Sequence, residues 1–155
     1  VAGTGVLPIL DFVFFIYRKI IYTVVKQKAG LEAAKKINVY NEDFDQVFFD
    51  GFLVEIYGYF TEIKDCVGFE LIKHLSVICR QNKLPMFKAF LRFSNGDQCF
   101  DVERLNDRCS EQFVEKVLNE GPTERIYVCG PPQFNKDVPE FALNHGLTKE
   151  KIILI

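Results

Sequence analysis

Residues 1–8 read V-A-G-T-G-V-L-P, and the fold interpretation starts from this glycine-rich stretch. Val1 and Ala2 have the character of a strand end, while Pro8 suits the first turn of a helix. Glycines between a strand and a helix let backbone N–H groups approach a phosphate, whose charge a helix N-terminus favours. A tight strand-to-helix turn needs glycine even without a ligand. The stretch therefore predicts a strand–turn–helix unit and leaves phosphate binding open.

A helix is expected from about Pro8 to Lys28. One apolar face follows helical spacing and consists of Ile9, Phe12, Val13, Ile16, Ile20 and Val24. Charged residues, which would each cost about 2.5–3.5 kcal/mol near the centre of a bilayer helix, interrupt this apolar stretch at Asp11, Arg18 and Lys19. The pattern therefore favours a buried helix of a globular domain, and we expect no transmembrane segment.

Strands and helices alternate along the rest of the chain. Strands are expected over residues 52–57, 86–93, 125–129 and 151–155, and helices over 65–82 and 106–119. The strand at 86–93 alternates apolar residues with Lys88 and Arg92, which is typical of an edge strand guarded by charge.

Two segments break this regularity. Residues 31–51 hold short apolar runs around an acidic turn, which predicts a small excursion or hairpin inserted into the domain. Pro139 lacks an N–H group and clashes with the preceding helical turn, so it should not lie deep inside a helix. We therefore expect a short turn at Pro132–Lys136, followed by a helix that Asp137 caps.

Alternating strands and helices predict one α/β domain over residues 1–155, a three-layer α/β/α arrangement with a parallel, doubly wound sheet. In the strand order 3-2-1-4-5 the glycine turn follows the central strand, of which only Val1 and Ala2 are present. Each buried backbone group left unpaired by a gap would cost about 1–3 kcal/mol. We therefore expect a longer polypeptide or a partner chain to supply that strand, and the 155 residues alone to be poorly soluble and not to turn over NADH.

The composition excludes several classes of function. With 19 Lys+Arg and 21 Asp+Glu the formal net charge is −2, which gives no basic footprint for nucleic acid. Five cysteines without a C-x-x-C motif favour reduced thiols over a disulfide scaffold or structural zinc. His74 and His145 lack neighbours at metal-ligand spacing, so no metal is expected. No signal peptide is visible, and the expected location is cytoplasmic, or the cytosolic or organellar face of a membrane, not secreted.

A second motif, Cys129-Gly130-Pro131-Pro132, ends the strand expected at 125–129. Parallel sheets bind ligands outside the carboxyl ends of their strands, so this turn should face the same crevice as Gly3–Gly5. A cysteine at a strand end is also simply a small apolar residue, and two prolines can form a rigid turn. Taken alone, the motif leaves a structural and a ligand-binding role open.

Together the two motifs carry a resemblance to a known family. The G-T-G-x-x-P turn of Gly3–Pro8 and the C-G-P-P turn with Phe134 shortly after it resemble the pyridine-nucleotide domain of the ferredoxin–NADP reductase superfamily. Its members include NADH–cytochrome b5 reductases, the nitrate reductase flavin module, ferric reductases and NADPH oxidases. The expected order of elements agrees along the whole chain except at residues 31–51. The motif pair indicates the superfamily without selecting a member.

The resemblance implies an NAD(P)H-dependent flavoprotein reductase domain, in which hydride passes to FAD and electrons continue to a haem, iron or quinone acceptor. Gly3, Thr4 and Gly5 would hold the diphosphate and nicotinamide side, and Cys129 would be the catalytic residue that lines the nicotinamide pocket. The adenosine would lie near Tyr59–Thr61. The remaining cofactor-binding residues that the resemblance implies are Pro8, Phe60, Ser94, Asn95, Gly130, Pro131, Pro132 and Phe134.

The flavin-binding half of such a reductase, a barrel with an R-x-Y-[ST] motif, is absent from this sequence. The near match at Arg125–Val128 lies inside an expected strand and is not that motif. FAD would therefore come from a barrel in the same or another chain, and an electron-acceptor protein or haem would be a further partner.

Several positions depart from the family pattern. Ala2 stands where family turns often have a glycine, and the chain ends in Ile155 where many members end in an aromatic residue. NADP users commonly carry arginine after the second strand and Ser-Arg after the third, whereas this chain has Phe60 and Ser94-Asn95 there. Without a guanidinium fork a 2′-phosphate is poorly held. The sequence therefore favours NADH, with Lys64 as a single-charge substitute nearby.

A second hypothesis belongs to another class of function. The chain would be a degenerate, nucleotide-binding-like domain that serves as a non-catalytic structural subunit of a larger complex. The absent adenosine-side arginines and the absent flavin half favour this alternative, because a fold does not determine a function.

Overall fold

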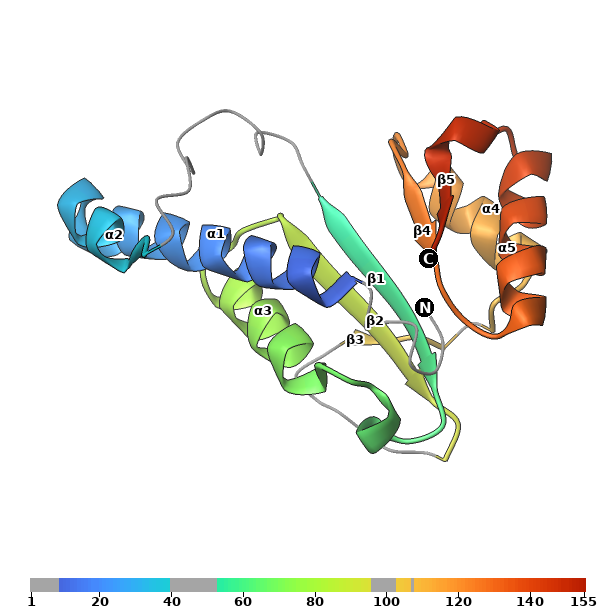
Figure 1. Ribbon diagram of the computed structural model, residues 1–155, viewed down its shortest axis with the longest axis horizontal. Coiled ribbons are helices and arrows are strands. Elements are labelled where there is room, and N and C mark those ends of the chain that lie inside the picture. The colour runs from blue at the N-terminus through green and yellow to red at the C-terminus, as the bar shows by residue number, and fades with distance from the viewer. Residues whose placement is uncertain (1–8, 40–52, 96–102, 107) are drawn as a thin grey trace.

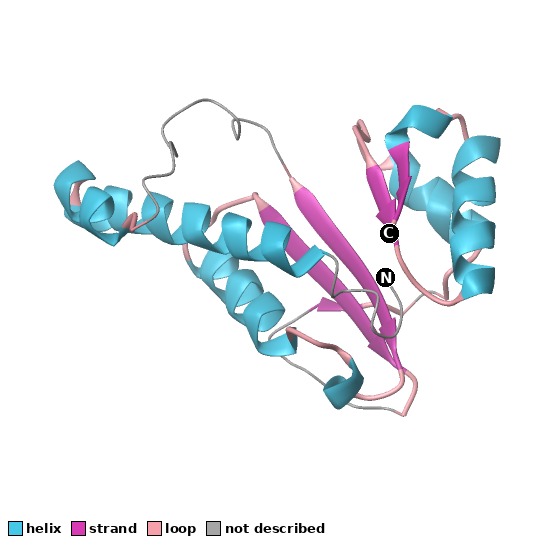
Figure 2. Cartoon of the chain, in the orientation of Figure 1, coloured by secondary structure: helices cyan, strands magenta, loops and turns pink. Residues whose placement is uncertain are grey.

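The structure of the chain is a computed structural model that describes residues 9–39, 53–95, 103–106 and 108–155. These residues form an α/β protein with five α-helices and two small parallel sheets. Figure 1 shows the path of the chain, and Figure 2 shows how the helices flank the strands. The glycine turn at Gly3–Gly5, Pro8 and the strand end at Val1-Ala2 lie outside the described residues.

The first described element is the expected long helix. Helix α1 (Leu10–Ala29) ends at Gly30, whose φ of 87° few other residues adopt and whose N–H donates to the Lys26 carbonyl at 3.1 Å. A second helix, α2 (Leu31–Ile37), follows at once and packs back on α1. The expectation of a hairpin over residues 31–51 is therefore wrong for its first seven residues, and residues 40–52 lie outside the described part of the chain.

The larger sheet consists of three parallel strands. Strand β1 (Val54–Phe60) pairs with β2 (Phe87–Phe93) along its full length, from Val54 opposite Phe87 to Phe60 opposite Phe93. Strand β2 also pairs with β3 (Glu103–Arg104). The expectation that β2 is an edge strand is therefore wrong: its alternating charges lie on one face of a central strand, where Lys88 pairs with Glu55 at 3.1 Å.

The smaller sheet pairs β4 (Ile126–Val128) with β5 (Ile152–Leu154), also in parallel. Among the described residues, β1 and β4 belong to different sheets and do not pair with each other. The strand expected between them, to be supplied by a longer polypeptide or a partner chain, remains a prediction, and the two residues of it that this sequence holds, Val1 and Ala2, lie outside the described part of the chain. In Figure 1 the arrowheads of β1, β2 and β4 point the same way, so their carboxyl ends face one side of the molecule.

Helices α1 and α3 (Phe69–Gln81) cover one face of the larger sheet (Figure 1). The apolar side chains that meet there form the main core, and those with almost no exposed surface are Val13, Ile16, Ile20, Ile72 and Leu75. Close-packed aliphatic side chains of this kind exclude water and supply the main driving force for folding. This core holds β1 and β2 in position from one side.

Aromatic side chains cover the other face of the larger sheet. Tyr57 stacks on Phe90 with ring centroids 5.0 Å apart, and Phe113 packs edge-on against Tyr57 at 5.4 Å. Tyr59 lies 6.4 Å from Phe113 and 6.3 Å from Phe134. Phe113 belongs to α4 (Glu111–Asn119) and Phe134 to α5 (Pro132–Asn144), so these contacts attach the C-terminal elements to β1.

Two helix starts differ from expectation for local reasons. Helix α4 begins at Glu111 rather than 106, because the Ser110 side chain caps it by accepting a hydrogen bond from the Phe113 N–H at 3.3 Å. Helix α3 begins at Phe69, after a short 3₁₀ helix, η2 (Ile63–Asp65), and a left-handed glycine, Gly68. These caps are set by single side chains and one backbone angle, which periodicity does not reveal.

Helix α5 runs without interruption from Pro132 to Asn144 and contains Pro139. The expectation of a separate turn at Pro132–Lys136 is therefore wrong. Pro132 at the first helical position needs no N–H donor, and Pro139 removes one backbone hydrogen bond further along. Packing of α5 against α4 and complete burial of Ala142 offset that loss.

None of the helices in the described ranges combines the length and the apolar character that crossing a membrane requires.

We expect Gly68→Ala to lower the free energy of unfolding by about 1–3 kcal/mol, measured by urea denaturation. Gly68 has φ of 80°, which strains an alanine, and an added Cβ would lie 2.6 Å from Cδ2 of Leu10. Gly121→Ala is the matched control, because a Cβ there meets nothing within 4 Å, and it should change stability by less than about 0.5 kcal/mol. Equal losses in the two variants would contradict this account of the α3 start.

Candidate functional site

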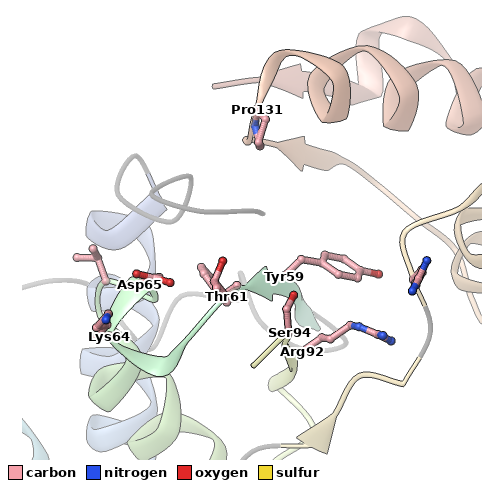
Figure 3. Close-up of a pocket in the computed structure, with 10 residues that line it drawn as sticks. Tyr59, Thr61, Lys64, Asp65, Arg92, Ser94 and Pro131 are labelled. Atoms are coloured by element: carbon pink, nitrogen blue, oxygen red, sulfur yellow. The ribbon is translucent and has the colours of Figure 1, made fainter. Parts of the chain in front are cut away.

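A cavity of about 830 Å³ opens at the carboxyl ends of β1 and β2. Figure 3 shows its floor, where Tyr59, Thr61 and Ser94 lie near one another, with Pro131 across the opening on the turn that follows β4. A cavity of several hundred Å³ is in the range that small-molecule ligands and cofactors occupy. The site therefore joins segments of the chain that are about seventy residues apart.

The floor of the cavity is held together by the parallel pairing of β1 and β2. The pairing continues past the strand ends, because the Ser94 N–H donates to the Phe60 carbonyl at 2.9 Å and the Asn95 N–H to the Thr61 carbonyl at 3.0 Å. The Asn95 side-chain amide also donates to Oε1 of Glu62 at 3.0 Å. These bonds keep the two turns that follow the strands at one edge of the sheet.

The 3₁₀ helix η2 forms the next part of the wall and contributes Lys64 and Asp65. A reciprocal capping box fixes it: the Asp65 carboxylate accepts the Glu62 N–H at 3.0 Å, and the Glu62 side chain accepts the Asp65 N–H. The Glu62 carboxylate also pairs with the Lys64 ammonium. Lys64 is therefore paired with Glu62, while the Asp65 carboxylate accepts a backbone hydrogen bond and keeps its negative charge.

Two guanidinium groups, Arg92 and Arg108, line the same cavity. Arg92 lies on β2 opposite Tyr59, and its Nη1 donates to the Asn106 carbonyl. A carbonyl accepts a hydrogen bond without cancelling the positive charge. Within the part of the chain that the structure describes, neither guanidinium forms an ion pair with a carboxylate. The cavity therefore carries a local positive excess in a chain whose net charge is −2.

The opposite wall comes from the start of α5. The Asn135 N–H donates to the Pro131 carbonyl at 3.0 Å and begins the helix, whose N-terminal end carries a partial positive charge. Phe134 reaches across to Tyr59, as described above. Cys129, directly before this turn, is 8% exposed, and Gly130 and Pro132 flank Pro131 in the chain.

The structure brings some of the predicted site residues together. Five of the predicted cofactor-binding residues line one cavity: Tyr59, Phe60, Thr61, Ser94 and Pro131. Asn95 hydrogen-bonds at its rim, and Phe134 contacts the cavity residue Tyr59. The described lining does not include Cys129, Gly130 or Pro132. Gly3, Thr4, Gly5 and Pro8 lie outside the described residues.

The remaining lining residues were not predicted as site residues. Asp65 and Val67 come a few residues after β1, where the sequence has no motif. Lys64 was considered only as a single positive charge in place of the family's arginines. Arg92 was noted as a charged residue on a strand, and Arg108 lies in an irregular loop with no motif around it. The alternation of β2 was the one signal that placed Arg92 on a polar face.

Burial sets the protonation of several groups on and around the larger sheet. The Tyr57 hydroxyl donates to Glu55 at 2.9 Å, and burial together with this carboxylate holds the pKa of Tyr57 far above its ordinary value. Burial raises the pKa of the Cys66 thiol to about 12 and that of Cys79 to about 11. These three groups are neutral at physiological pH and add no charge to the cavity.

The described residues contain no group of three or more His, Cys, Asp and Glu side chains placed to hold a metal ion. Comparison with known proteins adds no further constraint, because no family model, curated protein or solved structure matches this chain.

We expect Asp65→Ala to destabilise the chain by about 0.5–2 kcal/mol, because it removes one half of the capping box at the cavity wall. Asp65→Asn is the matched control: its amide oxygen can still accept the Glu62 N–H, so its loss should stay below about 0.5 kcal/mol. Thermal or urea unfolding followed by circular dichroism measures both. Equal stability of the alanine variant and the unchanged chain would show that the cap contributes nothing.

Proposed function

We propose that the chain is the NAD(P)H-binding module of a flavin-dependent oxidoreductase. The observation that carries this proposal is the convergence of Tyr59–Thr61, Ser94 and Pro131 on one cavity at the carboxyl ends of parallel strands. Nucleotide ligands of open α/β sheets bind at that edge. The proposal includes the finer fold, a three-layer, doubly wound sheet similar to the nucleotide domain of ferredoxin–NADP reductases, completed by a central strand between β1 and β4.

The cavity fits a dinucleotide in size and in charge. Its volume of about 830 Å³ suits a ligand of that class, and its cationic side chains, together with the start of α5, suit a diphosphate. The Tyr59 ring, flanked by Phe113 and Phe134, offers a rigid aromatic surface near the place proposed for the adenosine. Thr61 and Ser94 add hydroxyl groups that can donate to or accept from a ribose.

In this proposal the turn after β4 serves the reacting end of the cofactor. NAD(P)H supplies a hydride from its nicotinamide, and FAD from another domain or chain accepts it. Cys129 and Gly130 would border the nicotinamide, while Gly3, Thr4 and Gly5 would hold the diphosphate. The chain's own contribution is to orient the cofactor and to balance its charge, since correct placement accounts for much of the rate of such a step.

Binding to the cavity can be tested directly with a bulky substitution. We expect Thr61→Tyr to weaken NAD(P)H binding at least about tenfold, because the added ring occupies space at the end of β1. Isothermal titration of the full chain with NADH and with NADPH measures this effect. Thr123→Tyr is the matched control, since Thr123 lies in a loop that is not part of the cavity lining.

If neither dinucleotide binds the unchanged chain, the proposed function is wrong, and the alternative of a non-catalytic structural subunit gains support. If both bind but Thr61→Tyr and Thr123→Tyr behave alike, the dinucleotide binds somewhere other than this cavity.

Placement of the nicotinamide near Cys129 predicts protection of its thiol. We expect saturating NAD(P)H to slow alkylation of Cys129 several-fold at about pH 8, followed by peptide mass spectrometry. Cys66 and Cys79 are internal controls: burial raises the pKa values of their thiols to about 12 and about 11, so they hold little thiolate and should react slowly with or without nucleotide. If Cys129 is alkylated equally fast with and without saturating nucleotide, the nicotinamide does not lie at this turn.

A further inference from the structure

We propose that the hairpin of α1 and α2 is a membrane-binding surface that recognises anionic lipid headgroups. This surface, called here the lysine tip, consists of residues 26–37 together with Val39. The resemblance described above does not extend to residues 31–51, so α2 has no part in the proposed function. The proposal is therefore independent of the cavity and of any nucleotide that binds there.

Contacts between the two helices hold the lysine tip in one shape. Gly30 turns the chain with φ of 87°, its carbonyl accepts the Ala34 N–H at 3.2 Å, and α2 packs back on α1. Ala34 has no exposed surface and forms a small core with Tyr22, against which Phe15 and Val25 pack. Side chains on a hairpin fixed in this way lose less freedom when they bind than side chains on an open loop.

The lysine tip carries a local excess of positive charge. Residues 26–37 contain four lysines and one glutamate, whereas the whole chain has a net charge of −2. The four lysines, all of them exposed, are Lys26, Lys28, Lys35 and Lys36. Lys35 pairs with the glutamate, Glu32, at 3.3 Å, and exposed pairs of this kind are weak. A surface of clustered anionic headgroups has the complementary charge.

Apolar side chains are exposed at the same tip. Leu31 is 38% exposed, Ile37 43% and Val39 75%. Transfer of these side chains into the boundary between headgroups and acyl chains removes apolar surface from water. Lysine stems can lie along the same boundary while their ammonium groups stay among the headgroups. Lysines combined with exposed apolar side chains are typical of helices that lie on an anionic bilayer.

The size and position of the tip favour a bilayer over a protein partner. In Figure 1 α2 lies beside the C-terminal end of α1, at the end of the molecule away from α4 and α5. One seven-residue helix and the end of another offer little of the roughly 800 Å² that each partner buries in a stable protein interface. A lipid surface requires no matching shape, because charge attraction and apolar burial add up over a few side chains.

Co-sedimentation of the full chain with lipid vesicles tests the proposal. The probes are vesicles of phosphatidylcholine alone and vesicles in which about one-third of the lipid is phosphatidylserine. We expect the chain to bind the anionic vesicles at least about tenfold more tightly, and the difference to shrink as salt screens the charges. The full chain includes the acidic residues Glu42, Asp43 and Asp45, which follow the tip in the sequence and lie outside the described residues. The test therefore measures the charge that a membrane meets.

The contribution of charge is tested with a double variant. Lys28→Gln/Lys36→Gln should weaken binding to the anionic vesicles at least about tenfold, because each lysine near such a surface adds to the attraction. Lys136→Gln/Lys149→Gln is the matched control, since it removes the same charge from exposed residues outside the tip. The control should change binding by less than about twofold.

The apolar contribution is tested separately. Ile37→Gln should weaken binding to the anionic vesicles several-fold, because less apolar surface is buried. Leu143→Gln is its control, since Leu143 is exposed to a similar extent, 45% against 43%, and lies on α5. Circular dichroism checks that each variant keeps the helix content of the unchanged chain.

Equal binding to the two kinds of vesicle, or binding to neither, overturns the proposal. An equal loss in Lys28→Gln/Lys36→Gln and in its control overturns it as well, because the attraction would then belong to the whole chain. Polyglutamate is the probe for an acidic protein partner. If it binds as tightly as the anionic vesicles and Ile37→Gln weakens neither, the tip recognises acidic polypeptides rather than a bilayer, and the proposal is wrong.

Discussion

The parallel pairing of β1 and β2 is the constraint on which the rest of the site depends. Parallel strands in register bring the segments that follow them to the same edge of the sheet. Here the register runs without a break from Val54 and Phe87 to Phe60 and Phe93, and two further backbone bonds carry it into Ser94 and Asn95. A slip of either strand by one residue would turn Tyr59 or Arg92 toward the apolar core, and the cavity would lose part of its floor.

The two faces of this strand pair have different chemistry, and each determines what can pack there. The face toward α1 and α3 is apolar and buried, with Phe60 and Phe87 among aliphatic side chains, which makes it a support rather than a site. The opposite face is aromatic and then cationic along the strand direction, from Tyr57 to Tyr59 and on to Arg92. Because Phe113 and Phe134 meet the tyrosines, the turn at Pro131 is brought opposite the strand ends. The aromatic contacts thus connect the elements of the two sheets.

Periodicity predicted most of the elements but not their ends or their neighbours. The apolar spacing of residues 9–24 indicated α1, and alternation at 86–93 indicated β2. Alternation could not tell that β2 lies between two strands, because β3 has only two residues and no pattern of its own. Pro139 misled the prediction for α5, since the free energy gained by packing Ala142 and its neighbours is a tertiary effect that a local rule on proline does not include.

The candidate site shows the same division between local and tertiary information. Thr61, Ser94 and Pro131 could be predicted because they follow strands, and the ends of parallel strands share an edge. Tyr59 and Phe60 were expected to follow the strand at 52–57 as well, but they are the last residues of β1, which extends to Phe60. Arg92 could not, because alternation assigns it to a polar face without saying what lies in front of that face. Helices α4 and α5 pack on Tyr57 and Tyr59 and cover this face of the sheet up to Tyr59. They do not cover Arg92, and the cavity opens there. Arg108 depends on a loop that no repeat or motif describes. A net charge of −2 likewise hides a cavity whose described lining carries Lys64, Arg92 and Arg108 against one carboxylate, Asp65. The local charge of this cavity is a property of packing rather than of composition.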